Sequence, residues 1–318
     1  MSGIKSETND WLWRGSYRIS WSLLRQNSRA EENKKGEGKN VLFIHGFGVS
    51  SKQFRDNLPA LASKGYNVFA IDLIGFGDSS KPQIEYSTNL WADLVNDFIA
   101  EVIDGKVYLV GNSIGSLISL VAAESYAAPT TSSSPSSSGD RRENRISGVI
   151  LLNCASGMNS KVAKLVFTIL DLVLLSPLGR WLFDSLRGAD NIAGILQNVY
   201  KNTERVDSNL VQPISQAAED AGAFEAFVTI LTGSPGVRPE KVLPSVDIPV
   251  LILWGEEDNI TPIDGPVGSA FQVIAQERSD VQFVRLPELG HLPHDDDPDT
   301  INTKMISWLE EIHANALR

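Results

Sequence analysis

Residues 109–117 read LVGNSIGSL, in which a serine stands between two glycines at alternating positions. The stretch follows an apolar run at 107–110 that is typical of a short buried strand, and it leads into residues 114–123, which are typical of a helix. A Gly-x-Ser-x-Gly sequence between strand and helix is typical of a sharp turn that exposes the serine at the end of a sheet, with Gly111 and Gly115 where a Cβ would clash. A small serine in an ordinary tight bend is the alternative, and this stretch alone leaves it open.

Apolar strands and helical segments alternate along most of the chain. Such alternation predicts an α/β fold with a doubly wound, mostly parallel sheet. Two short apolar runs around Gly15, at 11–24, predict a hairpin that precedes this sheet. The expected strands are residues 41–46, 67–72, 107–112, 148–153, 249–255 and 281–286, and helices are expected at 51–64, at 88–103 and directly after the serine turn.

The strand rhythm stops between residues 153 and 234, where the sequence is helical in pattern with strong apolar faces. We therefore expect a helical cap inserted into the sheet domain. The expected boundaries are a first part of the core at 1–154, the cap at 155–235 and a second part of the core at 236–318. Most of the apolar faces are expected to pack on the core, while some line a pocket for an apolar substrate or touch a membrane surface.

A Ser- and Pro-rich segment, AAPTTSSSPSSSGDRREN, begins at Ala127. Its composition cannot build a core, so residues 127–145 are expected to be a disordered insert. The insert follows the helix after the serine turn and precedes a strand, which places it at the N-terminal edge of the strands. Active sites of open α/β sheets lie at the opposite edge. The insert is therefore expected to be remote from the chemistry.

Composition excludes several classes of function. The chain has 318 residues, a formal net charge of −11 and one cysteine. An acidic surface argues against nucleic acid as a partner and against simple electrostatic docking on anionic lipid. The single Cys154 excludes an internal disulfide and a cysteine-based metal site, and it is expected to be a small buried residue at the end of a strand. No phosphate-binding loop, zinc cluster or dinucleotide fingerprint is present, so neither a cofactor nor a metal is expected.

Membrane and export signals are also missing from the sequence pattern. No segment reaches about 18 consecutive apolar residues, so no transmembrane helix is expected. The longest candidate, at 165–175, contains Asp171 and is followed by Pro177. The first residues, MSGIKSETND, have neither the apolar centre of a secretory signal nor the composition of an organelle transit peptide.

Two further residues complete a catalytic pattern with Ser113. Asp258 follows the strand expected at 249–255, and His291 follows the strand expected at 281–286. The order Ser, acid, His is the one that a nucleophile turn of this kind requires, and all three residues lie at the C-terminal ends of strands. Ser113 is thus predicted to be the nucleophile, His291 the general base, and Asp258 the acid that orients the imidazole and stabilises its protonated form.

Other titratable residues near these positions receive different interpretations. Glu256 and Glu257 are expected to be solvated loop residues. His294, in the acidic sequence HDDDPD, is the one plausible substitute for the base, and His313 is expected to be exposed on the last helix.

An oxyanion hole is expected where the first parallel strand ends in the sequence HGFG, residues 45–48. The backbone N–H groups of Phe47 and Ile114 are predicted to point at the developing oxyanion. His45 is interpreted as a residue that holds the turn rather than as an acid or base. Asp72 and Asp78 are expected to hold the glycine-bearing loop that follows the second parallel strand.

Taken together, these motifs resemble the α/β-hydrolase superfamily over nearly the full length of the chain. The resemblance rests on HGFG, DLIGFGDSSKP, GNSIGS, LWGEED and GHLP. Within the superfamily, the chain is similar to the plant and algal chlorophyll dephytylases and pheophytinases in WLWRGSYRISW, LLNCASGMNSK, NVYKNTERVD, AFVTILTGSPG, LILWGEEDNITPIDGPVG and HLPHDDDPD, and its Ser-rich insert suggests an algal member.

This resemblance implies an α/β-hydrolase fold, with Ser113, Asp258 and His291 as the triad. It further implies hydrolysis of the phytyl ester of chlorophyll-type pigments in the chloroplast. The expected partner is a small apolar ester, with possible peripheral contact with the thylakoid membrane. A long isoprenoid tail needs a long apolar channel, and burial of each CH₂ group is worth about 0.8 kcal/mol.

Two other readings remain open on the sequence. Carbon–carbon bond hydrolases of ring-cleavage products share the serine turn and triad, and their dianionic substrates call for an arginine such as Arg180, Arg187 or Arg205. A ligand-binding receptor of the same fold is the second alternative. Haloalkane dehalogenases and epoxide hydrolases are disfavoured because they require aspartate where Ser113 stands.

Overall fold

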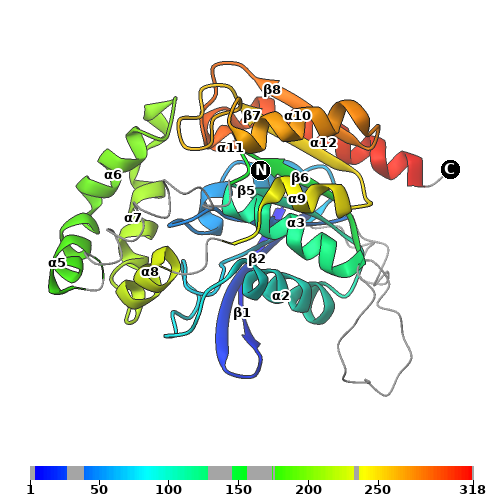
Figure 1. Ribbon diagram of the computed structural model, residues 1–318. Coiled ribbons are helices and arrows are strands. Elements are labelled where there is room, and N and C mark those ends of the chain that lie inside the picture. Colours follow the sequence, from blue (N-terminus) through cyan, green and yellow to red (C-terminus); the bar gives the residue numbers. More distant parts are fainter. Residues whose placement is uncertain are drawn as a thin grey trace.

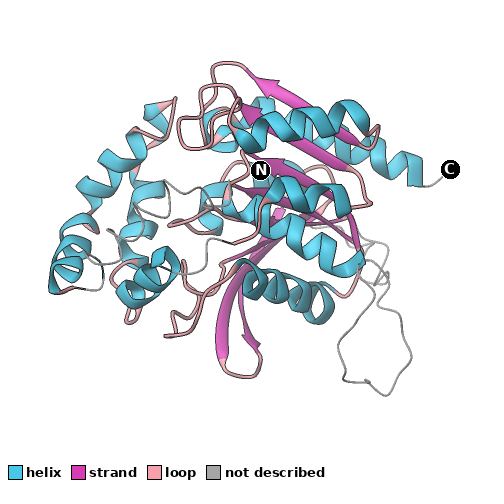
Figure 2. Cartoon of the chain, in the orientation of Figure 1, coloured by secondary structure: helices cyan, strands magenta, loops and turns pink. Residues whose placement is uncertain are grey.

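The computed structural model describes residues 4–26, 39–127, 145–155, 174, 176–232 and 236–316. Its centre is an eight-stranded sheet in the order β1-β2-β4-β3-β5-β6-β7-β8, shown in Figure 1 and Figure 2. The pairs from β4 to β8 are parallel, whereas β2 pairs antiparallel with both β1 and β4. The predicted mostly parallel α/β sheet is therefore confirmed. Its strands are β1 (Ile4–Trp13), β2 (Tyr17–Gln26), β3 (Asn40–Ile44), β4 (Asn67–Ile71), β5 (Val107–Asn112), β6 (Ile146–Leu152), β7 (Val250–Gly255) and β8 (Val281–Leu286).

The opening hairpin is longer than the sequence predicted. Its turn lies at the expected place, in a three-residue loop between the paired residues Trp13 and Tyr17, with φ of 51° at Arg14 and 67° at Gly15. The strands, however, begin at Ile4 and end at Gln26, beyond the predicted range 11–24. Most of the added length, residues 4–10, is polar and lies on the edge strand β1, where backbone pairing rather than an apolar face decides the structure.

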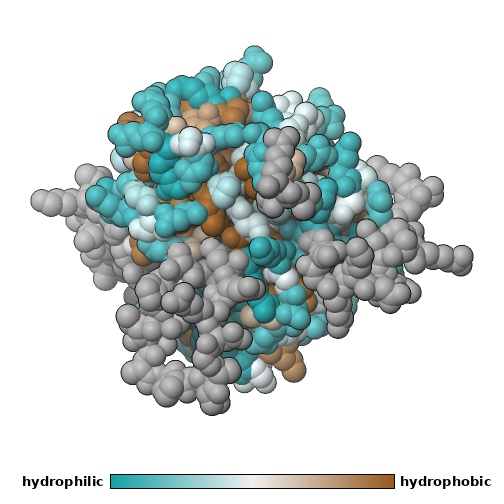
Figure 3. Space-filling model, turned by 90° about the vertical axis from the view of Figure 1, so that its right-hand side faces the viewer, coloured by the Kyte–Doolittle hydropathy of each residue, from teal (hydrophilic) through white to brown (hydrophobic). Residues whose placement is uncertain are grey.

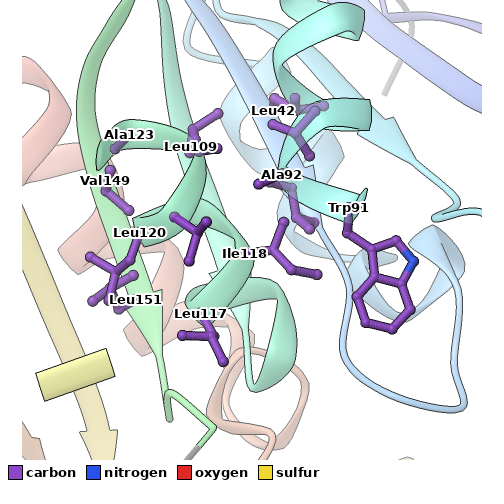
Figure 4. Packing of buried hydrophobic residues seen from close by; sticks show 14 of the residues in the cluster. Leu42, Trp91, Ala92, Leu109, Leu117, Ile118, Leu120, Ala123, Val149 and Leu151 are labelled. Atoms are coloured by element: carbon purple, nitrogen blue, oxygen red, sulfur yellow. The ribbon is translucent and has the colours of Figure 1, made fainter. Parts of the chain in front are cut away.

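Helices cover both faces of the sheet because alternate side chains of each strand point to opposite sides. On β3, Leu42 and Ile44 pack with α2 and α3, whereas Val41 and Phe43 pack with α1 and α12. Figure 4 shows the first of these layers, with side chains of α2 and α3 directed at strands β3, β5 and β6. The core helices are η1 (Ser51–Phe54), α1 (Asn57–Ala62), α2 (Thr88–Phe98) with a π turn (Ile99–Ile103), α3 (Ile114–Ala127), α9 (Pro239–Val242), η4 (Leu243–Ser245), α10 (Pro266–Glu277), α11 (Pro293–Asp296) and α12 (Pro298–Ala316).

A helical cap is inserted between β6 and β7 and lies to the left of the sheet in Figure 1. Its described elements are α5 (Pro177–Leu186), α6 (Ala189–Gln197), η3 (Thr203–Arg205), α7 (Ser208–Ala217) and α8 (Ala223–Thr232). The apolar run at 165–175 falls almost wholly outside the described residues. Within the described part of the chain, no helix has the length and apolar character needed to cross a bilayer.

The strand order has a switch point between β3 and β5. Going outward, the chain builds β4 on one side of β3 and β5 on the other, so the connections diverge at this point. Ligands of open α/β sheets bind at such a switch point, beyond the C-terminal ends of the strands. The Ser-rich insert is attached at the other edge, between the end of α3 and the start of β6. The insert itself, at 128–144, and its predicted disorder lie outside the described residues.

Hydrophilic residues cover most of the described surface on the face that Figure 3 presents, with apolar residues between them. This face is the right-hand side of Figure 1, away from the cap. Its polarity agrees with the formal net charge of −11.

Candidate active site

The turn between β5 and α3 is the sharp one that the Gly-x-Ser-x-Gly sequence indicated. Ser113 has φ of 55°, a left-handed conformation that costs energy in a residue with a side chain. A Cβ on Gly111 would lie 2.3 Å from the carbonyl oxygen of Gly115, and a Cβ on Gly115 would lie 2.1 Å from that of Ile44. Glycine is therefore required at both positions, and the serine is lifted to the end of the sheet. The ordinary bend is excluded.

Asp258 and His291 meet across the ends of β7 and β8. Asp258 Oδ2 lies 2.8 Å from His291 Nδ1, and both side chains are buried. The same carboxylate accepts hydrogen bonds from the backbone N–H of Ile260 and from the N–H and hydroxyl of Thr261. Burial alone would raise the pKa of Asp258, but the bonds from His291 and Thr261 outweigh it and hold the pKa below its ordinary value. The acid is thus ionised and fixed beside the imidazole.

Asn153 is a member of the site that the sequence analysis did not identify. It directly follows β6, is fully buried and has φ of 45°. Its Nδ2 donates to Asp258 Oδ2 over 2.6 Å, and its Oδ1 accepts from the backbone N–H of Gly255 over 3.1 Å. Asparagine tolerates a left-handed backbone better than most residues. A polar residue of this type at the C-terminal end of a strand was the available signal.

The backbone of His291 is tied to the serine turn. Asn112 Nδ2 donates to the carbonyl oxygens of His291 and Leu152, over 3.2 Å in each case. Because His291 Nδ1 faces Asp258, its Nε2 is the nitrogen left for a substrate or nucleophile. Among the described residues, no hydrogen bond joins the Ser113 hydroxyl to His291. Contacts of this kind often shorten only when substrate binds.

The loop after β3 lies against the serine turn. A Cβ on Gly46 would be 3.5 Å from Ser113 Cβ, which shows how closely this backbone approaches Ser113. The backbone N–H groups of Phe47 and Ile114 donate to no other group in the described parts of the chain. Ile114 is also the first residue of α3, where the helix dipole favours negative charge. Both N–H groups are therefore available to an oxyanion.

His45 makes the turn-holding contacts expected of it. Its Nε2 accepts from the backbone N–H of Leu73 over 3.0 Å, and its Nδ1 donates to the carbonyl oxygen of Gly46 over 2.7 Å. Burial lowers the pKa of His45, which keeps the ring neutral in this arrangement. Asp72 holds the neighbouring loop by accepting from the N–H groups of Ser51 and Asp78.

Comparison with known proteins decides the family. The model of the alpha/beta hydrolase family matches residues 41–303. The chain belongs to this family. In Arabidopsis thaliana, a chloroplastic pheophytinase is 25% identical over 323 residues, which cover 86% of this chain and 62% of the relative. The chain thus spans about three fifths of that protein.

Two further proteins are similar to this alpha/beta hydrolase. A 2-hydroxy-6-oxo-6-(2'-aminophenyl)hexa-2,4-dienoic acid hydrolase of Metapseudomonas resinovorans is 22% identical, with 86% of this chain and 85% of the relative covered. A solved membrane phospholipase A, a bacterial virulence factor, superposes with a TM-score of 0.69 at 23% identity, covering 98% of this chain and 87% of that one. The structural likeness supports the fold alone.

The alternative site residues of this hydrolase have other surroundings. His294 is fully buried, neither ring nitrogen has a hydrogen-bond partner in the described structure, and burial lowers its pKa to about 4. It is therefore unsuited to replace His291. Glu257 pairs with Lys201 at the surface. His313, expected to be exposed, is partly buried on α12, and Cys154 is free and buried as expected.

A row of phenylalanine rings leads from the loop after β3 into the cap. The ring of Phe47 lies 5.7 Å from that of Phe76 and 6.0 Å from that of Phe227 on α8. Phe227 is 5.2 Å from Phe183 on α5, which is 5.5 Å from Phe224. These centroid distances are those of contacting aromatic rings. The rings therefore form a continuous apolar wall from the loop after β3 to helices α5 and α8 of the cap.

The three arginines considered for a charged ligand are engaged in ion pairs. Arg180 pairs with Asp184 and Glu225, and Arg187 also pairs with Asp184. Arg205 pairs with Asp56 and Asp295. No group of three or more His, Cys, Asp or Glu side chains in the described residues is placed to hold a metal ion.

Proposed function

We propose that this hydrolase is a serine esterase that cleaves a carboxylic ester of an apolar alcohol through an acyl-enzyme on Ser113. The observation that carries the proposal is the buried Asp258–His291 pair, held at 2.8 Å beside the strained turn that presents Ser113. The proposed substrate is the phytyl ester of chlorophyll or pheophytin.

The first half of the reaction acylates the serine. His291 Nε2 takes the proton of the Ser113 hydroxyl as its oxygen attacks the ester carbonyl carbon. The N–H groups of Phe47 and Ile114 stabilise the oxyanion that develops. Asp258 keeps the proton on His291 Nδ1 and stabilises the imidazolium. The tetrahedral intermediate collapses, the C–O bond to the alcohol breaks, and His291 returns its proton to the leaving alcohol.

The second half releases the acid. A water molecule gives a proton to His291 Nε2 and attacks the acyl carbon, and the same two N–H groups stabilise the second oxyanion. Collapse of this intermediate breaks the bond to Ser113 Oγ, which recovers the proton from His291. One ester and one water thus yield one acid and one alcohol, and no cofactor takes part.

The aromatic row supports an apolar substrate. A C20 tail that lies along these rings would leave water, and each buried CH₂ group contributes about 0.8 kcal/mol. The distant likeness to a chloroplastic pheophytinase supports the phytyl ester in particular. With this substrate, the proposed location is the chloroplast, and the cap is proposed to make peripheral contact with the pigment-bearing membrane.

The carbon–carbon hydrolase reading receives less support from the site. Its relative acts on a dienoic acid, and such an anion calls for an arginine without a carboxylate partner. The three candidate arginines of the cap are each paired with Asp or Glu. A silent receptor is disfavoured by the ionised acid beside the imidazole, which a binding module does not need.

The decisive experiment is chromatography of the products after incubation with chlorophyll, pheophytin and a simple phytyl ester. We expect release of phytol by the native protein and none by Ser113→Ala, with the fold retained. A loss on the order of 10⁴- to 10⁶-fold in kcat is typical of triad removal. Equal activity in the serine variant would contradict the mechanism. Turnover of a short test ester without phytol release would contradict the substrate alone.

A further inference from the structure

A short stretch of the cap lies against the loops that carry both the acid and the base. Residues 199–202, here termed the strap, follow α6 and lead towards α7. Lys201 forms an ion pair with Glu257, the neighbour of Asp258. A Cβ on Gly290, the neighbour of His291, would lie only 3.1 Å from both Lys201 Cγ and the carbonyl oxygen of Val199. The strap is therefore in close contact with both loops.

The carboxylate of Asp296 joins the strap to the base loop. Its Oδ1 accepts from the backbone N–H groups of Lys201 and Asn202, each over 3.0 Å. Its Oδ2 accepts from the backbone N–H of Gly290 over 3.2 Å. Asp296 is 5% exposed. Hydrogen bonds to an ionised acceptor are stronger than neutral ones, so one buried side chain links the cap backbone to the residue directly before His291.

The neighbouring Asp295 anchors the same region in another way. It is 1% exposed and accepts from Arg55, from the hydroxyl of Tyr200 over 2.8 Å and from Arg205 over 2.5 Å. Removal of one partner from a buried ion pair leaves a charge without compensation and destabilises the fold. Substitution of Asp295 is thus expected to destabilise the fold. Asp296 is the residue whose substitution can test the link between cap and base loop while the fold is retained.

We propose that Asp296 is a positioning residue that couples the seating of the cap to the placement of His291. The proposal rests on the function proposed above for Ser113 and His291. The backbone at His291 is held from one side by Asn112 of the serine turn and from the other, through Gly290, by Asp296. A shift of the strap changes the hydrogen bond between Asp296 and the Gly290 N–H. A substrate that fills the cap therefore affects the position of His291 as well as its own binding.

Asp296→Asn should keep the hydrogen bonds to the strap and remove the one to Gly290. The amide oxygen in the place of Oδ1 still accepts from Lys201 and Asn202, whereas the amide NH₂ faces the Gly290 N–H and loses that bond. Small misplacements of a catalytic group cost up to about 100-fold in rate. We therefore expect labelling of Ser113 by a fluorophosphonate, and kcat for a short ester, to fall roughly 10- to 100-fold with KM nearly unchanged.

The matched control is Asp297→Asn, which removes the same charge one residue further on. Asp297 accepts from the backbone N–H of Thr300 at the start of α12, and asparagine caps a helix equally well. Its contacts do not include the strap or Gly290, so we expect native rates. A second variant, Gly290→Ala, pushes the new Cβ against the strap and should slow labelling as Asp296→Asn does.

Two measurements that need no substrate complete the test. Amide hydrogen exchange should become faster at Gly290 but not at Lys201 or Asn202 in Asp296→Asn. The low-field NMR signal of the His291 Nδ1–H, assigned by its loss in His291→Ala, should shift in Asp296→Asn and stay in place in Asp297→Asn.

The outcomes separate this proposal from the proposed function. Faster exchange at Gly290 with native labelling and an unmoved His291 signal would overturn the coupling, as would equal slowing by Asp296→Asn and Asp297→Asn. If the native protein were not labelled at Ser113, the proposed esterase would fail, and the exchange and NMR results would still decide whether Asp296 positions His291.

Discussion

At the scale of single residues, the order Ser113, Asp258, His291 was predictable because each follows an apolar strand whose end the sequence marks. The strand end made Asn153 a candidate, but the hydrogen-bond partners of Asn153 and Asp296 were not predictable. Asn153 is separated from Asp258 by 105 residues, and nothing local in the sequence indicates that two loops so distant share a hydrogen bond. Their roles follow from the pairing of strands and the seating of the cap, which only the folded chain provides.

The surroundings of Asp258 predict the effect of changing it. Its carboxylate accepts hydrogen bonds from four residues, namely Asn153, Ile260, Thr261 and His291. In Asp258→Asn an amide NH₂ must face at least one of these donors, and His291 loses the acceptor that fixes its tautomer. We expect kcat to fall on the order of 10⁴-fold. Glu257→Gln, which alters only a surface ion pair, should retain nearly full activity; if it were the crippling change, Asp258 would not be the acid.

The buried His294 predicts a pH dependence of stability. Its pKa in the folded protein is about 4, against an ordinary value of 6.5. Between these values the unfolded chain binds a proton at this ring and the folded chain does not. The free energy of unfolding therefore decreases as the pH falls from 6.5 towards 4, by up to about 1.4 kcal/mol per pH unit from this group.

Replacing His294 by leucine removes this contribution. The side chain lies beside the ring of Phe54, with centroids 4.9 Å apart, so an apolar group suits the site. Denaturant titrations at pH 6.5 and 4.5 should show a smaller loss of stability in His294→Leu than in the native protein. The same change at the partly buried His313 serves as the control. If His294→Leu lost as much stability between pH 6.5 and 4.5 as the native protein, the result would show that the His294 ring is protonated in the folded state.

At the scale of elements, the parallel strands were predicted closely because each is a continuous apolar run between turn residues. The extent of β1 was not predicted closely, because it is an edge strand in which buried and exposed side chains alternate irregularly. The cap was predicted from the interruption of the strand rhythm. Its facing sides were not, because an apolar helix can present any side to the core until its neighbours are known.

The position of Phe227 on α8 now gives a specific test of the cap. Its ring contacts those of Phe47 and Phe183, so Phe227→Asp places a charge on the apolar wall. A long isoprenoid ester would bury that charge, whereas a short test ester reacts at Ser113 without covering it. We expect kcat/KM for the long ester to fall at least about tenfold more than that for the short one.

The control for this change is Val273→Asp on α10, where the native side chain is 52% exposed. It should affect neither ester. Equal loss of both esters in Phe227→Asp would show that the ring is structural core rather than channel.

At the scale of the whole molecule, buried contacts join the cap to the sheet domain. A cluster of apolar side chains joins cap helices to the base loop, and it comprises Ile192, Leu196, Tyr200, Leu210, Val211 and Leu292. Beside it, the buried Asp295 binds Arg55 of the core and Arg205 of the cap. At a second place, Lys81 pairs with Asp220, which lies in the loop between α7 and α8. The cap is thus anchored at two separate loops.

Such shared anchoring predicts that cap and core unfold together. Trp181 is the one tryptophan at 155–235, so the difference in fluorescence between the native protein and Trp181→Phe reports on the cap, while far-ultraviolet circular dichroism reports on the whole chain. In urea the two signals should give coincident transitions. Arg205→Met leaves Asp295 short of one partner and should lower the midpoint of both signals together, since a broken buried pair costs about 3 to 5 kcal/mol. A separate, earlier transition of the Trp181 signal in the native protein would show that the cap is an independent unit and that its anchors contribute little to its stability.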